Sequence, residues 1–307
     1  MFVVCGEALM DVFTAGDTPT GVALDARVGG SPFNVAVGLA RLAQPVAFFS
    51  ALSTGFLGDR LLRALTDEGV DVSAVPRLDA PTTLGLVGLD AAGVPSYAFY
   101  GEGAADRLLA PEAIERLPQG VHAIHVGSYA TVVEPVASTL RTLIERAHET
   151  TLIAYDPNIR LNVEPDLARW RETLDWTKRR AHLLKISDED LHLLLPGTDP
   201  QAFAAQALAQ GVRLVVVTRG GEGALAWTAD AHAAAEPVKV SVIDTVGAGD
   251  TFQAALLTWL AENDRLSPQA LGRLSAGDLR DALGFAARAA AITCSRRGAD
   301  MPRRADV

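Results

Sequence analysis

The residues best suited to chemistry lie in one short run, Asp244-Thr245-Val246-Gly247-Ala248-Gly249-Asp250-Thr251-Phe252, which leads directly into a helical pattern over 253–261. The first backbone N–H groups of a helix have no partner within the helix and carry the positive end of its dipole, and glycine lets an anion come close to the backbone. The amides of Gly247, Ala248 and Gly249 are therefore predicted to bind a phosphate group.

Asp250 is the unusual member of this run, because a carboxylate beside a bound triphosphate repels it. Its place is explained if the carboxylate accepts a proton from an attacking hydroxyl group during phosphoryl transfer. A phosphate-binding turn and a base so close together predict a kinase. The alternative is that Asp250 is only a first-turn acid favoured by the helix dipole, and that the glycines form a tight turn.

A second set of candidate residues lies near the N-terminus. The run Gly29-Gly30-Ser31-Pro32-Phe33-Asn34 predicts a glycine turn, a Ser N-cap and a Pro at the first helical position. Asn34 offers a donor and an acceptor to a sugar hydroxyl, and Gly30 leaves room for a ligand. Asp11 follows the first predicted strand, at the end where open α/β sheets bind ligands. Alternatively, Asp11 and Asn34 are ordinary turn and cap residues.

A third glycine-rich segment, Thr218-Arg219-Gly220-Gly221-Glu222-Gly223, follows the apolar run over 213–217. It is a candidate nucleotide-binding turn, although its glycines lack the G-x-G-x-x-G spacing and a plain turn explains them nearly as well. Other classes are excluded. No lysine follows a glycine, so there is no Walker A loop, and the protein kinase, zinc protease, serine hydrolase and paired-cysteine motifs are absent.

The composition is that of a globular enzyme, with 49% hydrophobic and 21% charged residues in 307. A net charge of −10 argues against nucleic-acid partners. The N-terminal segment is interrupted by Glu7 and Asp11 and predicts a strand rather than a signal peptide, and no run reaches transmembrane length. Cys5 and Cys294 fit no metal spacing and are expected to be reduced. We therefore expect a cytoplasmic protein without a membrane partner.

Apolar runs alternate with helical patterns, which predicts an α/β fold with a doubly wound, mostly parallel sheet and helices on both faces. Strands are predicted near 2–9, 45–51, 122–126, 151–155, 182–186 and 213–218. Helices are predicted near 32–43, 57–68, 134–149, 166–178, 187–195, 200–210, 247–261 and 277–291.

Two segments, 12–29 and 82–101, break this rhythm and alternate like strands, the second around a turn at Asp90-Ala91-Ala92-Gly93. They predict a small β-sheet lid that closes over a site, attached to a main domain of residues 1–11, 30–81 and 102–307. Two ordinary surface hairpins would explain the pattern equally well.

With its early Gly-Gly/Asn run and its late Asp-Thr-Val-Gly-Ala-Gly-Asp run in this order, the chain resembles the ribokinase-like (PfkB) carbohydrate kinases over residues 1–302, and bacterial fructokinases in particular. The resemblance implies ATP and Mg²⁺ as cofactors. It implies a catalytic base and an anion hole at Asp250, Gly247, Ala248 and Gly249. It implies sugar contacts at Asp11, Gly30 and Asn34, and a nucleotide-binding turn with Thr218, Gly220 and Gly223.

The family's N-x-x-E motif falls on Ser187-Asp188-Glu189-Asp190, where Ser and Asp stand at the two key positions. The resemblance makes Ser187 a nucleotide contact and Asp190 a candidate metal ligand, and Lys185 just before them could reach phosphate instead. The tail over 293–299 resembles the loop that, in some members, helps the loop of Asp244 to hold a monovalent cation. This implies K⁺ as a candidate activator.

Two further stretches bear on the acceptor. Asp156-Pro157-Asn158-Ile159-Arg160 resembles the D-P-N-x-R stretch of fructokinases and 2-keto-3-deoxygluconate kinases, and makes Asn158 and Arg160 candidate substrate contacts. Glu102 stands where the fructokinase lid segment usually carries an Arg. A carboxylate there would repel an acid sugar, which favours a neutral hexose.

The expected reaction is therefore ATP-dependent phosphorylation of the terminal hydroxyl of D-fructose to fructose 6-phosphate. The alternatives are a 2-keto-3-deoxygluconate kinase, another sugar or nucleoside kinase and, more remotely, a non-catalytic sugar-sensing protein on the same fold. Because lids in the family often pair, a homodimer is expected through residues 22–28 and 84–100.

Overall fold

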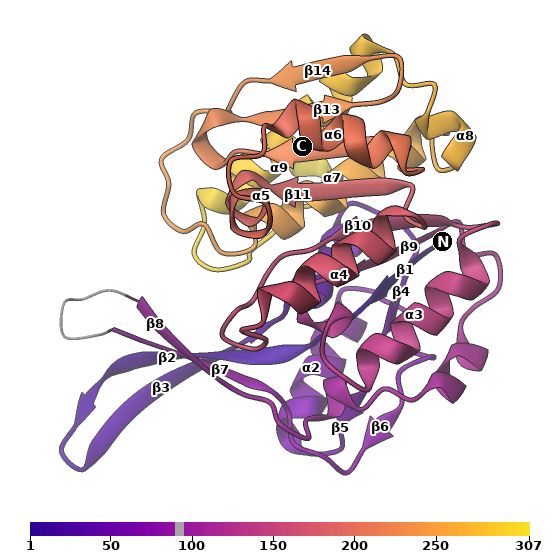
Figure 1. Cartoon of the computed structure of the whole chain (residues 1–307). Helices are drawn as coiled ribbons and strands as arrows, with labels where there is room; N and C mark the ends of the chain where they lie inside the picture. Colours follow the sequence, from indigo (N-terminus) through magenta and orange to yellow (C-terminus); the bar gives the residue numbers. More distant parts are fainter. Residues whose placement is uncertain (90–94) are drawn as a thin grey trace.

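The main sheet has eight strands in the order β14-β13-β12-β11-β10-β9-β1-β4 (Figure 1). The computed structural model describes residues 1–89 and 95–307, so the turn predicted at 90–93 lies outside the described residues. The strands β4, β1, β9, β10, β11 and β12 run parallel to one another, and β13 and β14 join them antiparallel. Their bounds are β1 (Phe2–Cys5), β4 (Val46–Phe49), β9 (Ala123–Gly127), β10 (Leu152–Asp156), β11 (Leu183–Ser187), β12 (Leu214–Thr218), β13 (Ala224–Trp227) and β14 (His232–Ala235).

Helices cover both faces of this sheet. They are α1 (Ser31–Arg41), α2 (Phe56–Asp67), α3 (Val136–Ala147), α4 (Leu167–Lys178), α5 (Asp188–Leu194), α6 (Pro200–Ala209), α7 (Ala248–Glu262), α8 (Pro268–Leu271) and α9 (Ala276–Cys294). Short 3₁₀ helices span Ala105–Arg107, Pro111–Arg116, Tyr129–Thr131, Gly220–Glu222 and Arg304–Asp306. Within residues 1–89 and 95–307, no helix is long and apolar enough to cross a membrane.

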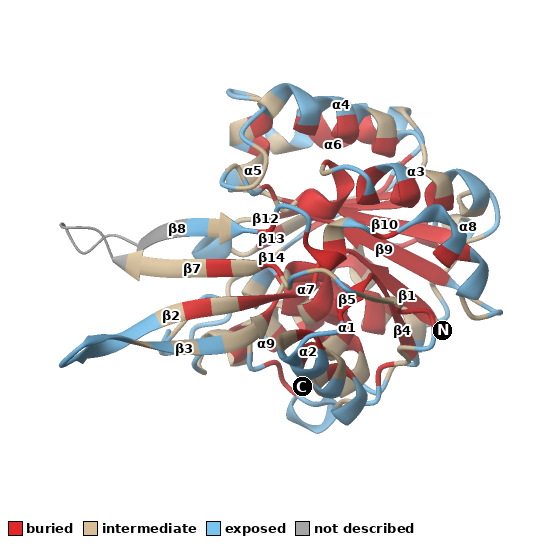
Figure 2. Ribbon diagram, turned by 90° about the horizontal axis from the view of Figure 1, so that it is seen from below, coloured by how far each residue is buried: buried red, intermediate tan, exposed pale blue. Residues whose placement is uncertain are grey.

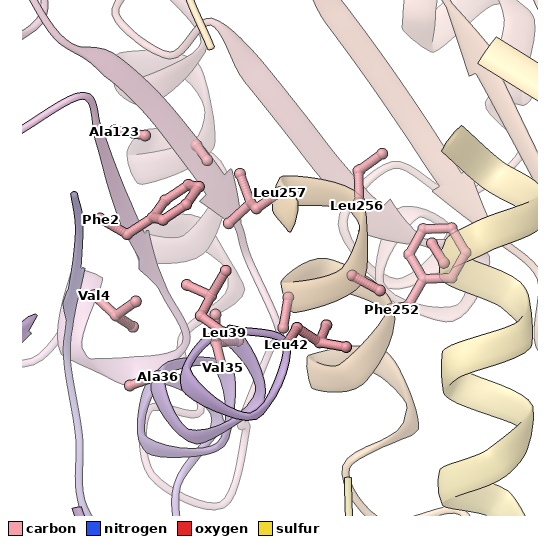
Figure 3. Packing of buried hydrophobic residues seen from close by; sticks show 14 of the residues in the cluster. Phe2, Val4, Val35, Ala36, Leu39, Leu42, Ala123, Phe252, Leu256 and Leu257 are labelled. Atoms are coloured by element: carbon pink, nitrogen blue, oxygen red, sulfur yellow. The ribbon is translucent and has the colours of Figure 1, made fainter. Parts of the chain in front are cut away.

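The central strands of the sheet are buried on both faces, because successive residues are mostly apolar rather than alternately apolar and polar. In β1, Phe2 and Val4 pack into the core layer that contains α1, α7 and α9, whereas Val3 and Cys5 pack into the layer that contains α3, α4 and α6. Figure 3 shows the first layer, with Phe2 and Val4 facing side chains of α1 and α7. The predicted doubly wound fold is confirmed.

A second sheet of four strands, in the order β3-β2-β7-β8, projects from the main body (Figures 1 and 2). Its strands are β2 (Leu9–Thr18), β3 (Gly21–Gly29), β7 (Leu84–Leu89) and β8 (Pro95–Tyr100). Strand β2 is buried at its base and exposed from Thr14 onward. The predicted small sheet is therefore present, and the segment that contains it begins earlier than expected. Asp11 lies inside β2, opposite Arg27 and Gly85, rather than in a turn after the first strand.

The sequence did not indicate the pair β5 (Leu52–Ser53) and β6 (Arg77–Leu78), the strands β13 and β14, or the short helix α8. Each is too short to carry a readable period, and β14 is rich in alanine, which strands disfavour.

Candidate active site

The start of α7 has the geometry of an anion site. Gly247 is the N-cap residue in the left-handed conformation, with φ 77°, and a Cβ at this position would lie only 2.6 Å from the Cβ of Ala299. Glycine is therefore required at Gly247. Among the described residues the N–H groups of Gly247 and Gly249 have no acceptor, whereas that of Ala248 donates to the Thr245 carbonyl at 3.2 Å. Two of the three predicted amides are thus available to an anion.

Asp250 lies in the first turn of α7 and is only 8% exposed. Its Oδ1 atom accepts a hydrogen bond from the Ser31 hydroxyl at 2.6 Å, and its Oδ2 atom accepts one from the Asn34 side-chain amide at 2.8 Å. The first turn of α1 therefore holds the carboxylate in place. Burial raises the pKa of Asp250, although the two hydrogen bonds and the charges of Lys185 and Arg160 oppose this. A raised pKa makes the carboxylate a better proton acceptor.

The predicted Ser31 N-cap is wrong. Gly30 is the N-cap residue, with φ 106°, and Ser31 and Pro32 are the first two helical residues. The Ser31 hydroxyl does not cap its own helix because it donates to Asp250 instead. Gly30 is needed at its position, because a Cβ there would lie 2.8 Å from the Glu7 carbonyl oxygen.

The Asp11 carboxylate fits a slot between two glycines of the small sheet. Side chains at Gly29 or Gly85 would collide with it, the second with a Cβ 3.0 Å from Oδ1. Burial raises the pKa of Asp11 to about 6, Arg160 opposes the rise and Asp250 adds to it. Asp11 has no hydrogen-bond partner within the part of the chain that the structure describes. It is thus a partly buried acceptor that lies within range of the charges of both Asp250 and Arg160.

Lys185 in the middle of β11 pairs with Asp156, the last residue of β10, with Nζ and Oδ2 2.7 Å apart and both residues buried. The same ammonium group lies beside the helix start, because a Cβ on Gly249 would be 3.3 Å from Nζ. A positive charge therefore stands next to the unbonded amides of α7, as the sequence predicts for a residue that reaches phosphate.

The other predicted residues lie at the same carboxyl edge of the sheet. Ser187 pairs in register with Thr218, and its hydroxyl caps α5 by accepting from the Asp190 N–H at 3.0 Å. Burial raises the pKa of Asp190 to about 6, Asp156 adds to this, and Lys185 and Arg160 oppose it. Asn158 has a left-handed backbone, with φ 40°, and Arg160 is exposed.

The turn after Thr218 bends sharply at two glycines. Gly220 and Gly223 have φ of 48° and 86°, and a Cβ on Gly223 would collide with the backbone of Ala235. The turn connects β12 with β13, beside Ser187. All the predicted groups except Asp244 thus meet along one edge of the main sheet and the base of the small sheet.

The comparison with known proteins identifies what this arrangement belongs to. The sequence profile described as "pfkB family carbohydrate kinase" matches residues 1–305. The chain belongs to this family of carbohydrate kinases.

Individual relatives agree with the family. A fructokinase of Rhizobium leguminosarum bv. trifolii is 34% identical over 281 residues, which cover 92% of this chain and 86% of that protein. A probable chloroplastic fructokinase-6 of Arabidopsis thaliana is 35% identical over 311 residues, which cover 97% of this chain and 78% of that protein. Fructokinase from Xylella fastidiosa with bound ATP superposes with a TM-score of 0.83 at 27% identity, covering 99% of this chain and 96% of that one. Fructokinase from Vibrio cholerae O395 with bound fructose, ADP and calcium ion superposes with a TM-score of 0.80 at 28% sequence identity, covering 97% of this chain and 94% of that one.

In this pfkB-family kinase, the Asp244 carboxylate ties the loop before α7 to the segment after α9. Its Oδ1 atom accepts from the Val246 N–H at 3.0 Å, and its Oδ2 atom accepts from the Gly298 N–H at 2.8 Å. Across residues 1–89 and 95–307, no group of three or more His, Cys, Asp or Glu side chains is arranged to hold a metal ion. Any cation there would need ligands other than a carboxylate cluster.

The sequence analysis did not single out Glu7, which follows β1 at the same edge of the sheet as the site. Glu7 is 2% exposed, and its Oε2 atom is buried without a partner in the described part of the kinase. Burial raises its pKa to about 7, against opposing effects that include the charge of Arg160. The signal was visible, because a carboxylate directly after an apolar strand in an α/β sheet sits at the ligand-binding edge.

Glu7→Gln is expected to raise the free energy of unfolding near pH 8 by up to about 3 kcal/mol, since one pKa unit corresponds to about 1.4 kcal/mol. The pKa is raised from 4.5 to about 7, so ionisation costs the folded state nothing below pH 4.5 and its full cost above pH 7. Denaturant unfolding of the wild type and the variant, near pH 8 and again below pH 4.5, measures the difference. An effect of equal size at both would contradict a desolvated Glu7.

Proposed function

We propose that this kinase transfers the γ-phosphoryl group of ATP to the terminal hydroxyl of D-fructose, giving fructose 6-phosphate. The observation that carries the proposal is the buried Asp250 carboxylate, held by Ser31 and Asn34 at the start of a helix whose Gly247 and Gly249 amides have no acceptor among the described residues. The relatives that carry the name fructokinase support the choice of sugar.

The sugar is held by two residues that frame the base. Asp11 lies near Asp250 with its carboxylate free of protein partners in the described chain, so it can accept hydrogen bonds from two sugar hydroxyls. Asn34 donates to Asp250 through Nδ2, which leaves its Oδ1 atom to accept from the sugar. Gly30, Asn158 and Arg160 complete the proposed contacts. These groups place one hydroxyl against Asp250, which takes its proton as the bond to phosphorus forms.

The nucleotide lies along the neighbouring strand ends, on Ser187, Thr218, Gly220 and Gly223, with Lys185 and the amides of Gly247, Ala248 and Gly249 at its terminal phosphates. The Ala248 N–H can contact a phosphate only after it leaves the Thr245 carbonyl. Binding of the anion can replace that 3.2 Å hydrogen bond. The charge that develops on the transferred group then meets fixed dipoles and one ammonium group.

Two cations accompany this scheme. In the described residues the Asp190 carboxylate accepts one long hydrogen bond, from the Ile159 N–H to Oδ2 at 3.4 Å, so its other lone pairs are free for a cation. A carboxylate of this kind suits Mg²⁺, which usually adds water and substrate phosphates as ligands, and we propose that Asp190 holds it. When bound it would neutralise phosphate charge. Asp244, with lone pairs left beside its two N–H donors, is the proposed ligand of K⁺.

We propose that the small sheet acts as a lid made of residues 12–29 and 82–101, and that the remaining residues form the main domain. Asp11 and the sugar would then be enclosed when it closes. Val22 and Leu24 on β3 are 51% and 53% exposed, and Tyr100 on β8 is 62% exposed, which supports a homodimer through the sheet. ATP as donor and two cysteines without a disulfide fit the cytoplasm.

One observation favours the second acceptor. The charge of Arg160 lies close to Asp11, and an Arg there also suits the carboxylate of 2-keto-3-deoxygluconate. Against it stands Glu102, which is exposed and has no cationic partner among the described residues. The sugar-sensing alternative has no support, because the base and the helix start are intact.

A panel of acceptors compared by kcat/KM with Mg-ATP tests the proposal. We expect D-fructose to exceed D-glucose, D-ribose, 2-keto-3-deoxygluconate and a nucleoside by at least about tenfold, the scale of discrimination that a few polar contacts provide. Glu102→Arg should raise kcat/KM for the acid sugar and leave that for fructose nearly unchanged. A preference of the wild type for the acid sugar would overturn both the choice of fructose and our interpretation of Glu102.

A further inference from the structure

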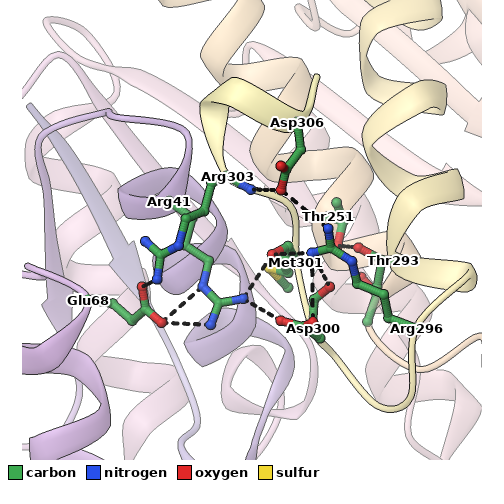
Figure 4. Close-up of polar contacts among 10 residues, drawn as sticks. Arg41, Glu68, Thr251, Thr293, Arg296, Asp300, Met301, Arg303 and Asp306 are labelled. Carbon is green, nitrogen blue, oxygen red and sulfur yellow. Dashed lines mark hydrogen bonds and ion pairs between the residues drawn. The ribbon is translucent and has the colours of Figure 1, made fainter.

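Residues 298–301, which follow α9, are linked to the ends of α1 and α2 by the side chain of Arg41. Its Nη1 atom donates to the Asp300 carboxylate and to the Met301 carbonyl, both at 2.8 Å. Its Nε and Nη2 atoms donate to Oε1 of Glu68, at 3.0 and 2.6 Å. Figure 4 shows this guanidinium between the two carboxylates. All three guanidinium nitrogens of Arg41 donate hydrogen bonds, so Asp300 and Met301 are held against the end of α1.

The other side of the same segment supports the predicted anion site. The Gly298 N–H donates to the Asp244 carboxylate at 2.8 Å, and Ala299 packs against Gly247 so closely that a Cβ on that glycine would lie 2.6 Å from the Ala299 Cβ. The direction of the Gly247 and Gly249 amides therefore depends on where the segment 298–299 sits.

Met301 continues the contact into the interior. It is 1% exposed and lies where α1 and α7 cross, because a Cβ on Gly38 would be 2.8 Å from both the Met301 Sδ and the Ala254 Cβ. These two helices carry the Asn34 amide and the Asp250 carboxylate that it holds. A shift of the tail would thus change both the amides and the base.

We infer that Arg41 is a positioning residue for phosphoryl transfer, which acts through residues 298–301 on the amides at the start of α7; the inference rests on the proposed function. Groups that stabilise a transition state must be held within a fraction of an ångström, and a displacement of about 1 Å can cost about 100-fold in rate. Arg41 is the side chain that joins α1 and α2 to this segment in the described residues, and Arg303 joins only the distal tail to Glu68.

The test compares Arg41→Gln with Arg303→Gln, a matched control. Arg303 donates to the other oxygen of the same Glu68 at 3.1 Å, its side chain is 65% exposed, and its side chain makes no other ion pair in the described residues. We expect Arg41→Gln to lower kcat between about tenfold and about 100-fold while KM for the sugar changes less than about twofold. Arg303→Gln should leave both near the wild-type values, and Arg41→Lys should fall between.

Binding separates positioning from simple loss of stability. With fructose present, Arg41→Gln should weaken binding of ADP with aluminium fluoride, which occupies the anion site, by about the same factor as kcat, and should leave binding of ADP alone unchanged. If Arg41→Gln does not fold, Asp300→Asn, at an exposed partner, tests the same link. Equal kcat for the two glutamine variants, or equal loss of ADP and ADP–fluoride affinity, would overturn the inference. Failure of the proposed function is distinct, because the wild type would then not phosphorylate fructose.

Discussion

Asp250→Asn is expected to lower kcat for sugar phosphorylation by about 100-fold to about 10,000-fold, the usual contribution of a general base. The sugar should still bind with nearly the same Kd, because Asp11 remains and a turned Asn34 amide offers a sugar hydroxyl its N–H group in place of its oxygen. The substitution is close to isosteric, and the Asn34 amide can turn so that its oxygen accepts from the new side-chain N–H group while the Ser31 hydroxyl keeps its acceptor. Steady-state kinetics with Mg-ATP and titration calorimetry with fructose measure the two effects.

Ser31→Ala is the matched control for this variant. It removes one hydrogen bond to the same carboxylate, 2.6 Å long, without removing the base. We expect a loss of kcat of about tenfold at most, since only the orientation and pKa of Asp250 change. If Asp250→Asn retained more activity than Ser31→Ala, the carboxylate would be structural and the site would transfer phosphate by another route.

The main sheet could be predicted from the sequence because its strands are buried on both faces. Runs such as 214–217 are apolar throughout, and the helices between them are long enough for a period to show. Alternation predicted the strands of the small sheet, although two separate surface hairpins would have had the same pattern. Short edge elements such as β13 and β14 were missed, since four residues carry little pattern and their pairing is decided by the neighbouring strand.

The site was predictable where the chemistry is local. The run from Gly247 to Asp250 is continuous in the sequence, and so its geometry could be inferred from helix physics. The contact between Ser31 and Asp250 joins residues 219 positions apart, and no local pattern indicates it. The same holds for Lys185, whose position could be predicted but whose partner Asp156 could not. Tertiary pairing of this kind follows from strand order, which the sequence does not state.

Lys185→Met should have the second large effect, on both stability and turnover. Lys185 is 4% exposed and its ammonium group lies 2.7 Å from Asp156, so its removal leaves a buried carboxylate unpaired, at a cost of about 3–5 kcal/mol. Turnover should fall by about 100-fold or more, because Nζ stands beside Gly249, where negative charge develops during transfer. Denaturant unfolding and kcat with Mg-ATP measure the two losses.

The double variant Lys185→Met/Asp156→Asn separates these losses. With both charges gone, no unpaired ion remains buried, so stability should return to within about 1–2 kcal/mol of the wild type. The rate should not recover, because the positive charge beside the helix start is still missing. Asp156→Asn alone keeps that charge and should lose far less turnover than Lys185→Met. If the double variant regained wild-type kcat, Lys185 would act only by neutralising Asp156, and the transferred phosphoryl group would be stabilised by the backbone amides without it.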